Sequence, residues 1–304
     1  MVQKRIESLI AAKAIPTDGR ITSGGWTFAQ GSGYDVVVES GSEAVLLISD
    51  SDNIGDLNID IAKGATLRIL NIVRNHSAMN IAIGVAEDAQ CLMTQVVVSA
   101  SDSRVVASLM ERGARFELGG VFVLTDDDQA SVTVDVNHIA SDCQSHTSVK
   151  GVAAGKSHGS FSGLVYVAPD AQRTDSVQSS RNVTMGEAHI ETLPQLEIYA
   201  DDVKCSHGAT VGQMEQEQIY YMRQRGLSEA DARKLQLEGF MRDILDRIDN
   251  EEVRREFELR QMRVSESRGC LHTMPSESIL EQAKLGQLRI ENLTYPSATS
   301  WHLP

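Results

Sequence analysis

The chain has 304 residues, and its 28 Lys and Arg against 42 Asp and Glu give it a formal charge of −14. Such an acidic chain lacks the basic surface that binds a phosphate backbone, which argues against nucleic acid as its main partner. Aromatic residues make up only 5% of the chain and apolar residues 41%. The core must therefore be built mostly from aliphatic side chains, which suits a narrow and regular interior.

The first fifteen residues (1–15) read as a short N-terminal helix that ends before Pro16. Charges at Lys4, Arg5 and Lys13 interrupt its apolar residues, so the segment lacks the uncharged core of a signal peptide. The chain has no run of about 18 uninterrupted apolar residues, the length that a membrane span needs. We therefore expect a cytoplasmic protein that does not bind a membrane.

Residues 20–213 carry a weak internal repeat, in which a small turn-like unit with a central alanine precedes a stretch of alternating apolar residues. The alanines of these units are Ala65, Ala89, Ala114, Ala130, Ala171, Ala188 and Ala209. Alternation with a period of two predicts strands with one buried face, and a repeat near twenty residues predicts coils stacked on one another. The sequence thus predicts a mainly β protein with a parallel β-helix over residues 20–213. The alternative is an antiparallel β-sandwich, but residues 20–213 contain no Asn-Gly or Asp-Gly hairpin signal.

One segment of this region partly matches a nucleotide-binding motif. A P-loop needs a glycine five residues before its Gly-Lys-Ser, followed by a helix whose N-terminus faces the phosphates. Here Gly155-Lys156-Ser157 has Lys150 in place of that glycine, and residues 158–167 read as a strand. We therefore expect a corner between two coils, and no nucleotide bound by this chain.

The densest polar cluster, residues 201–210, lies at the end of the β region. Alternate residues share a face of a strand, so Cys205 and His207 are expected to point the same way. A thiolate beside an imidazole is a partial ligand set for iron or zinc, which other residues or a second subunit must complete. Two alternatives stay open: a nucleophilic cysteine activated by the histidine, and a buried cysteine beside a hydrogen-bonded histidine.

The other cysteines are weaker candidates. Cys143 lies between His138 and His146, so it is a second possible metal ligand, although a surface loop would explain the same residues. Cys91 reads as core and Cys270 as incidental. The four cysteines form no CxxC pair, which argues against a disulfide framework or a structural zinc site.

Residues 214–264 change to a helical pattern, and residues 268–304 read as an irregular tail. A first helix is expected to end at Gly226, and Ser228 to open a second with Asp231 in the capping-box position. A third helix is expected to begin near Asn250. The apolar side chains of this region either bind a partner or cover the end of the solenoid. Those predicted to bind a partner are Tyr220, Tyr221, Phe240, Ile244 and Leu245.

Residues 194–212 (PQLEIYADDVKCSHGATVG) and 219–226 (IYYMRQRG) resemble the core of the SufB/SufD family, the scaffold subunits of the SUF iron–sulfur cluster assembly machinery. The resemblance covers about residues 130–248. It implies a right-handed parallel β-helix flanked by helices, and a pair of scaffold subunits that each hold a SufC-like ATPase through their C-terminal helices. It also implies that Cys205 and His207 lie near the subunit interface and bind a transient iron–sulfur cluster.

The resemblance is closest to the SufD type with a shortened N-terminus, but it does not settle which of the two roles the subunit has. Ala188 stands near the place where SufB-type chains have a cysteine, as in the SufD type, whereas residues 154–157 and 163–165 are closer to the SufB type. A homodimer and a heterodimer both stay open. We expect a non-enzymatic scaffold for cluster assembly. The alternatives are a cytosolic β-solenoid enzyme acting on a carbohydrate or an acyl donor, and a structural subunit that never holds a cluster.

Overall fold

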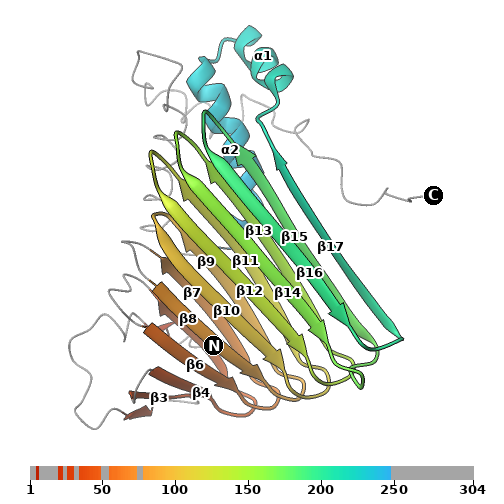
Figure 1. The fold of residues 1–304 in the computed structure, drawn as a ribbon. Coiled ribbons are helices and arrows are strands. Elements are labelled where there is room, and N and C mark those ends of the chain that lie inside the picture. The colour runs from red at the N-terminus through yellow and green to blue at the C-terminus, as the bar shows by residue number, and fades with distance from the viewer. Residues whose placement is uncertain are drawn as a thin grey trace.

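The computed structural model describes residues 5–6, 20–22, 26–30, 34–48, 55–73 and 78–247. Within these ranges the chain passes back and forth between two stacked β-sheets, with two helices at one end of the strands (Figure 1). Sheet A has the order β1-β5-β7-β9-β11-β13-β15-β17, and sheet B the order β16-β14-β12-β10-β8-β6-β4-β3-β2.

Sheet A is formed by β1 (Arg5–Ile6), β5 (Glu43–Ile48), β7 (Thr66–Val73), β9 (Gln90–Val97), β11 (Arg115–Leu124), β13 (Gln144–Ala153), β15 (Thr174–Thr184) and β17 (Val203–Gly212). Sheet B is formed by β2 (Arg20–Thr22), β3 (Trp26–Gln30), β4 (Tyr34–Val38), β6 (Gly55–Ile61), β8 (Ala78–Val85), β10 (Ser101–Leu109), β12 (Gln129–His138), β14 (His158–Val167) and β16 (His189–Ile198).

From β4 onward, each strand pairs in parallel with the strand one coil later, as β11 does with β13 and β12 with β14. This pairing confirms the predicted parallel β-helix and rules out the antiparallel sandwich. The start of the predicted range is wrong, because β2, β3 and β4 pair antiparallel. The reason is the length of the connections: the links from β2 to β3 and from β3 to β4 have three residues each, and only antiparallel strands can be joined so tightly.

Within the predicted N-terminal helix (1–15), the structure describes only Arg5–Ile6. These two residues are a strand rather than helix, and they pair in parallel with Val45 and Leu46 of β5. An outer strand presents unpaired backbone groups that a neighbouring segment can satisfy, whereas a helix of this length is marginal without packing. The other residues of the predicted helix lie outside the described ranges.

Each coil turns at two corners. The first corner leads from sheet B to sheet A, and its turns stack residues with positive φ: Gly41, Gly64, Asp88, Gly113, Asp142 and Arg173. Backbone bonds tie these turns together, since the N–H of Gly64 donates to the carbonyl of Glu87 and that of Asp142 to the carbonyl of Gln172. The predicted small residues Ala65, Ala89 and Ala114 follow these turns and are fully buried, as the stacking of tight coils requires.

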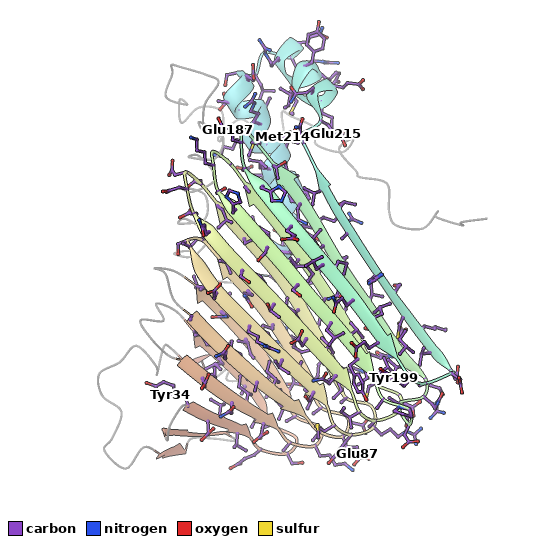
Figure 2. The ribbon with its side chains drawn as sticks, viewed as in Figure 1. Tyr34, Glu87, Glu187, Tyr199, Met214 and Glu215 are labelled. Atoms are coloured by element: carbon purple, nitrogen blue, oxygen red, sulfur yellow. The ribbon has the colours of Figure 1, made fainter. Side chains whose placement is uncertain are left out.

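The second corner leads from sheet A to sheet B, and stacks Asp126, Gly155 and Gly186 at positive φ. Figure 2 shows the two corners at opposite ends of the strands, with Glu87 at the first and Glu187 at the second. The Gly155-Lys156-Ser157 segment is one of these turns, and β14 follows it directly. Its prediction as a coil corner is confirmed.

Two helices follow the last strand: α1 (Gln216–Gln224) and α2 (Glu229–Leu245). The predicted signals are confirmed, since Gly226 takes a φ of +96° after α1 and the hydroxyl of Ser228 accepts the N–H of Asp231 at 3.1 Å. No helix in the described ranges is long and apolar enough to cross a membrane. The predicted third helix and the tail (268–304) lie outside these ranges.

The helices cover the outer face of sheet A near the second corner. Their buried side chains, such as Met241 and Ile244, pack against a cluster of valines on the strands that includes Val121 and Val152. Lys150 of β13 anchors α2, because its ammonium group donates to the carbonyl of Phe240 and to the carboxylate of Asp243, both at 2.6 Å. This covering belongs to the fold itself, so the valine cluster on sheet A does not need a partner protein to bury it.

Candidate functional site

The last coil of the solenoid is open. Within the described residues, β17 pairs only with β15, and β16 only with β14, so both strands keep one free edge. The residues of β17 are exposed or half-buried along its whole length. The predicted ligands Cys205 and His207 lie on this strand, near its start at the first corner.

The register of β17 shows where these two side chains point. Cys205 pairs with Ser176 and His207 pairs with Gln178. Both partners are buried in the interior of the solenoid, and paired residues of parallel strands share a face of the sheet. The structure therefore places Cys205 and His207 on the interior face of the last coil, side by side as their spacing predicts.

The surroundings of the two side chains differ. Cys205 is half-buried and packs against an apolar cluster that contains Val165, Val167 and Ala200, whereas His207 is exposed. Burial raises the pKa of the Cys205 thiol and the nearby Asp175 carboxylate raises it further, against a smaller lowering by a backbone hydrogen bond at Ser176. The thiol is protonated at neutral pH, so a metal would have to displace its proton on binding.

A row of buried polar groups leads through the interior to Cys205. His138 of β12 lies 2.9 Å through its Nε2 from the hydroxyl of Ser145 on β13, and that hydroxyl lies 2.8 Å from the hydroxyl of Ser176 on β15. Ser176 is the register partner of Cys205. Burial lowers the pKa of His138 to about 4, so its imidazole is neutral at pH 7.

A second polar row leads to His207. Thr147 of β13 pairs with Gln178, which in turn pairs with His207. Gly163 of β14 leaves the room that Gln178 needs, because a Cβ on Gly163 would lie 1.7 Å from Nε2 of Gln178. Neither row is among the features predicted from the sequence. The available signal was β15 itself, whose interior positions are all polar: Thr174, Ser176, Gln178, Ser180 and Asn182.

Cys143, the weaker predicted ligand, lies at the first corner in the position that Ala114 takes one coil earlier. Its side chain is fully buried, its Sγ donates to the carbonyl of Glu111 at 3.2 Å, and burial raises its pKa. His138 is buried and bonded to Ser145, while His146 is exposed on β13, so these histidines do not converge on the thiol. In the described part of the chain, no three His, Cys, Asp or Glu side chains form a group that could hold a metal.

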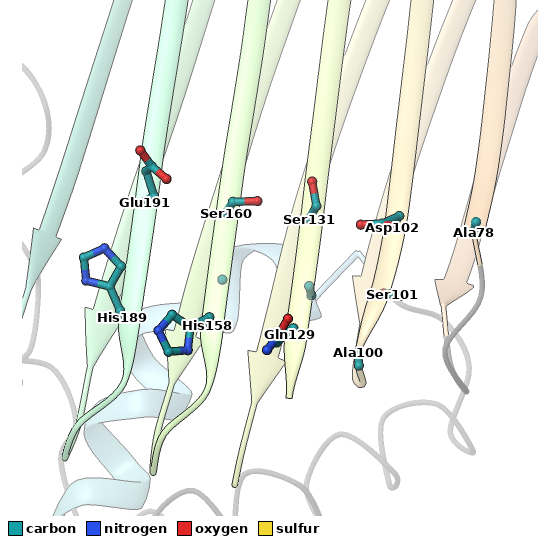
Figure 3. A pocket seen from close by; sticks show the side chains of 12 residues that line it. Ala78, Ala100, Ser101, Asp102, Gln129, Ser131, His158, Ser160, His189 and Glu191 are labelled. Carbon is teal, nitrogen blue, oxygen red and sulfur yellow. The ribbon is translucent and has the colours of Figure 1, made fainter. Parts of the chain in front are cut away.

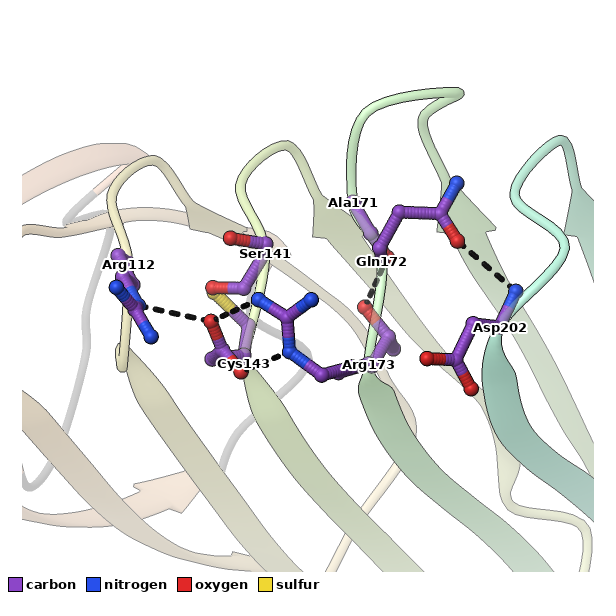
Figure 4. A network of polar contacts seen from close by, with 9 residues as sticks. Arg112, Ser141, Cys143, Ala171, Gln172, Arg173 and Asp202 are labelled. Carbon is purple, nitrogen blue, oxygen red and sulfur yellow. Dashed lines mark hydrogen bonds and ion pairs between the residues drawn. The ribbon is translucent and has the colours of Figure 1, made fainter.

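The corner around Cys143 is held by charges between coils (Figure 4). Asp142 accepts hydrogen bonds from Nε and a terminal nitrogen of Arg173, at 2.6 and 2.7 Å, and lies 2.8 Å from Nε of Arg112. The hydrogen bond from Arg173 and the charge of Arg112 lower the pKa of Asp142 to about 2. Because Asp142 is committed to these two arginines, we assign this network to stacking the coils.

The predicted partner-binding residues separate into two groups. Phe240 and Leu245 are partly buried and pack, with the fully buried Ile244, in the cluster on sheet A. Tyr220 and Tyr221 of α1 are 63% and 57% exposed, and the guanidinium of Arg225 lies 5.3 Å from the ring of Tyr221. Of these five residues, only the two tyrosines are largely exposed.

The fold and its last coil define a class: a parallel β-solenoid with a helical cover, which ends in an open, polar coil carrying a thiol and an imidazole. The family model for the SufBD core domain of SUF-system iron–sulfur cluster assembly matches residues 22–240. This match covers more than half of the chain. The protein belongs to the SufB/SufD family of the SUF iron–sulfur cluster assembly system, as the resemblance in its sequence implied.

Three relatives show how far the similarity reaches. SufD of Escherichia coli (strain K12) is 39% identical over 122 residues, which is 40% of this chain and 29% of that protein. A SufBD family protein of Synechocystis is 48% identical over 89 residues, 29% of this chain and 20% of that protein. One of Mycobacterium tuberculosis (strain H37Rv) is 31% identical over 161 residues, 48% of this chain and 41% of that protein. The chain therefore aligns with less than half the length of each of these curated relatives.

Proposed function

We propose that this chain is a non-enzymatic scaffold subunit for iron–sulfur cluster assembly, which works with a SufC-like ATPase and a second SufB/SufD-type subunit. The observation that carries the proposal is the place of Cys205 and His207. They lie together on the interior face of the last, open strand, where two polar rows end.

The pair cannot hold a cluster by itself. Clusters are usually held by four cysteine ligands, some of which histidine can replace, and this coil offers one thiol and one imidazole. The unpaired edges of β16 and β17 are the kind of surface that pairs with another chain. Large apolar side chains are exposed on and beside these strands: Leu193, Ile198, Tyr199 and Val211. A second subunit at this end would cover them and supply the missing ligands.

The metal test is anaerobic reconstitution with iron and sulfide, in the presence of the ATPase and a second subunit. We expect Cys205→Ser and His207→Ala to lose bound iron while their melting temperatures stay normal. Cys143→Ala is the matched control, since alanine fills the same corner position in the preceding coils, and it should keep its iron. Full iron occupancy in both site variants would contradict the ligand assignment and leave Cys143 as the next candidate, which loss of iron in Cys143→Ala would then indicate.

The partner test uses the exposed tyrosines of α1. A buried contact with the ATPase should be lost when charge is placed in it, because an unpaired charge is costly to bury. We therefore expect the double variant Tyr220→Asp/Tyr221→Asp to lose co-purification with the ATPase while remaining folded. Met110→Asp, at an exposed apolar residue directly after β10 and away from both the helices and the last coil, should keep it. Intact co-purification of the double variant would contradict this docking site.

A further inference from the structure

Two histidines lie side by side on the face of sheet B that points away from the solenoid interior. His158 begins β14 and His189 begins β16, and the two residues are register partners. Both are exposed, and their ring centroids lie 6.1 Å apart. Figure 3 shows the two rings next to each other at the second corner. They lie on the other sheet from Cys205 and His207, which are near the first corner, so the two pairs are separate.

The hydrogen bonding of His158 selects its tautomer. Its Nδ1 lies 3.0 Å from the carbonyl oxygen of Lys156, and a carbonyl oxygen can only accept, so the proton lies on Nδ1. The Nε2 atom keeps its lone pair. A histidine that donates one ring N–H to a backbone carbonyl is oriented in the way that metal-binding histidines usually are.

The separation of the rings suits a shared ion. A zinc–nitrogen bond is about 2.0–2.1 Å, which puts each ring centroid about 3 Å from the metal. Two rings on one ion therefore have centroids about 5–6 Å apart, depending on the angle at the metal. The observed 6.1 Å lies just above this range, so a small side-chain rotation would be needed to bring both nitrogens to the ion.

The pair also has room and a favourable charge beside it. The rings border an open hollow of about 530 Å³, which Ser160 and Glu191 also line. Glu191 follows His189 by two residues and so shares its face, where its carboxylate favours a cation. The nearby Lys156 lies 3.8 Å from the carboxylate of Glu187, which offsets its positive charge.

We propose that His158 and His189 bind one divalent first-row transition metal ion through a ring nitrogen each, with Nε2 the ligand from His158 and water completing the shell. Imidazole suits ions such as zinc, copper and iron. No third protein ligand converges here among the described residues, so two histidine ligands define the site.

The test is titration of the full-length chain with Zn²⁺ by calorimetry. The chain carries Cys205→Ser and His207→Ala, so that the proposed cluster ligands cannot contribute. We expect one zinc ion whose affinity falls at least tenfold in His158→Gln and at least tenfold in His189→Gln. His146→Gln, which removes an exposed strand histidine from sheet A, is the matched control and should bind as the parent does. The melting temperature without metal verifies that each variant is folded. It should stay unchanged, because both rings are exposed.

Three outcomes would overturn the proposal. They are no zinc binding by the parent, an affinity unchanged in both variants, and a loss confined to one variant, which would show a single-histidine contact. A cobalt titration gives a second readout. A visible absorption change should appear in the parent and be absent when His158→Gln and His189→Gln are combined. Iron reconstitution on Cys205 and His207 can succeed or fail independently of this result.

Discussion

The early and late coils of the solenoid share one backbone plan but have different interiors. The inward side chains of β8 are all apolar: Met79, Ile81, Ile83 and Val85. Those of β15 are all polar. The strands hydrogen-bond to their neighbours through the backbone in both places, so the parallel pairing does not depend on which side chains fill the coil. A solenoid can therefore change its interior chemistry from one coil to the next.

The late coils are also larger. The positive-φ residues of the first corner are 23, 24 and 25 residues apart from Gly41 to Gly113, and then 29 and 31 residues apart up to Arg173. The polar interior is costly, since buried atoms such as Oε1 of Gln178 and Oδ1 of Asn182 accept no hydrogen bond from the protein. An apolar interior would be more stable, so stability does not explain the polar rows; the proposed role of Cys205 and His207 as ligands would.

The largest expected effect comes from removing the aromatic ring at the junction between the two kinds of coil. Phe122 of β11 is fully buried. Its register partner in the next coil is Gly151, whose own partner one coil later is Asn182. Phe122→Ala should lower the free energy of unfolding by about 3–5 kcal/mol, since it leaves a cavity. Denaturant unfolding measures this, with Tyr220→Ala as an exposed control that should change little. A loss below about 1 kcal/mol would show that the late coils collapse around the gap.

The next effect tests the polar interior through pH. The pKa of His138 is about 4 in the folded chain and near 6.5 when unfolded, so the unfolded state binds more protons between these values. The stability from neutral His138 is complete above about pH 6.5 and is lost as pH falls toward 4. It amounts to about 3 kcal/mol. Unfolding of wild type and His138→Gln from pH 4 to 7 isolates this slope. Parallel pH profiles would contradict the burial of a neutral imidazole.

The sequence predicts the coils well because two local signals are enough: alternation along the strands and small residues at the corners. It does not separate the two corners, since Ala89 marks the first and Ala188 the second with the same kind of unit. It also predicts helix where Arg5–Ile6 is a strand. That strand forms because it pairs with the edge of β5 that β7 does not occupy. β5 lies far away in the sequence, so no local pattern predicts this pairing.

The candidate site divides in the same way. The common face of Cys205 and His207 follows from strand geometry alone and agrees with the register. The row from His138 through Ser145 to Ser176 could not be predicted, because Ser145 and Ser176 meet only if the coil has 31 residues, and coil length varies along the chain. Likewise, the apolar pattern of α2 predicts that Ile244 is buried but not that sheet A, rather than a partner, buries it.

A third prediction compares the covered outer face of sheet A with an uncovered corner. Lys150→Met keeps the apolar stem of the side chain but removes its bonds to Phe240 and Asp243. Hydrogen bonds to charged groups contribute about 1.5–3 kcal/mol, and relief of the buried charge offsets part of this, so we expect a loss of about 2 kcal/mol. Denaturant unfolding measures the loss, and proteolysis should cut α2 more readily.

Lys156→Met is the matched control for this comparison. Lys156 is exposed, and its contact with Glu187 is an exposed ion pair at 3.8 Å, so the change should stay within about 0.5 kcal/mol. Equal effects of the two substitutions would show that Lys150 does not hold α2 on the sheet.

The smallest effect comes from adding one methyl group, either at the open end of the solenoid or in its packed interior. A Cβ at Gly208 of β17 would meet nothing within 4 Å, and its φ lies outside the left-handed region. Gly208→Ala should therefore stabilise the isolated chain by about 0.4–1 kcal/mol, because alanine has fewer conformations to lose on folding. At Gly151 the same Cβ would lie 2.2 Å from the ring of Phe122, so Gly151→Ala should cost about 1–3 kcal/mol. Denaturant unfolding of both variants at low protein concentration measures the two changes in the free energy of unfolding, which should have opposite signs. A loss of stability in Gly208→Ala that appears only at high protein concentration would instead indicate that a second copy covers β17.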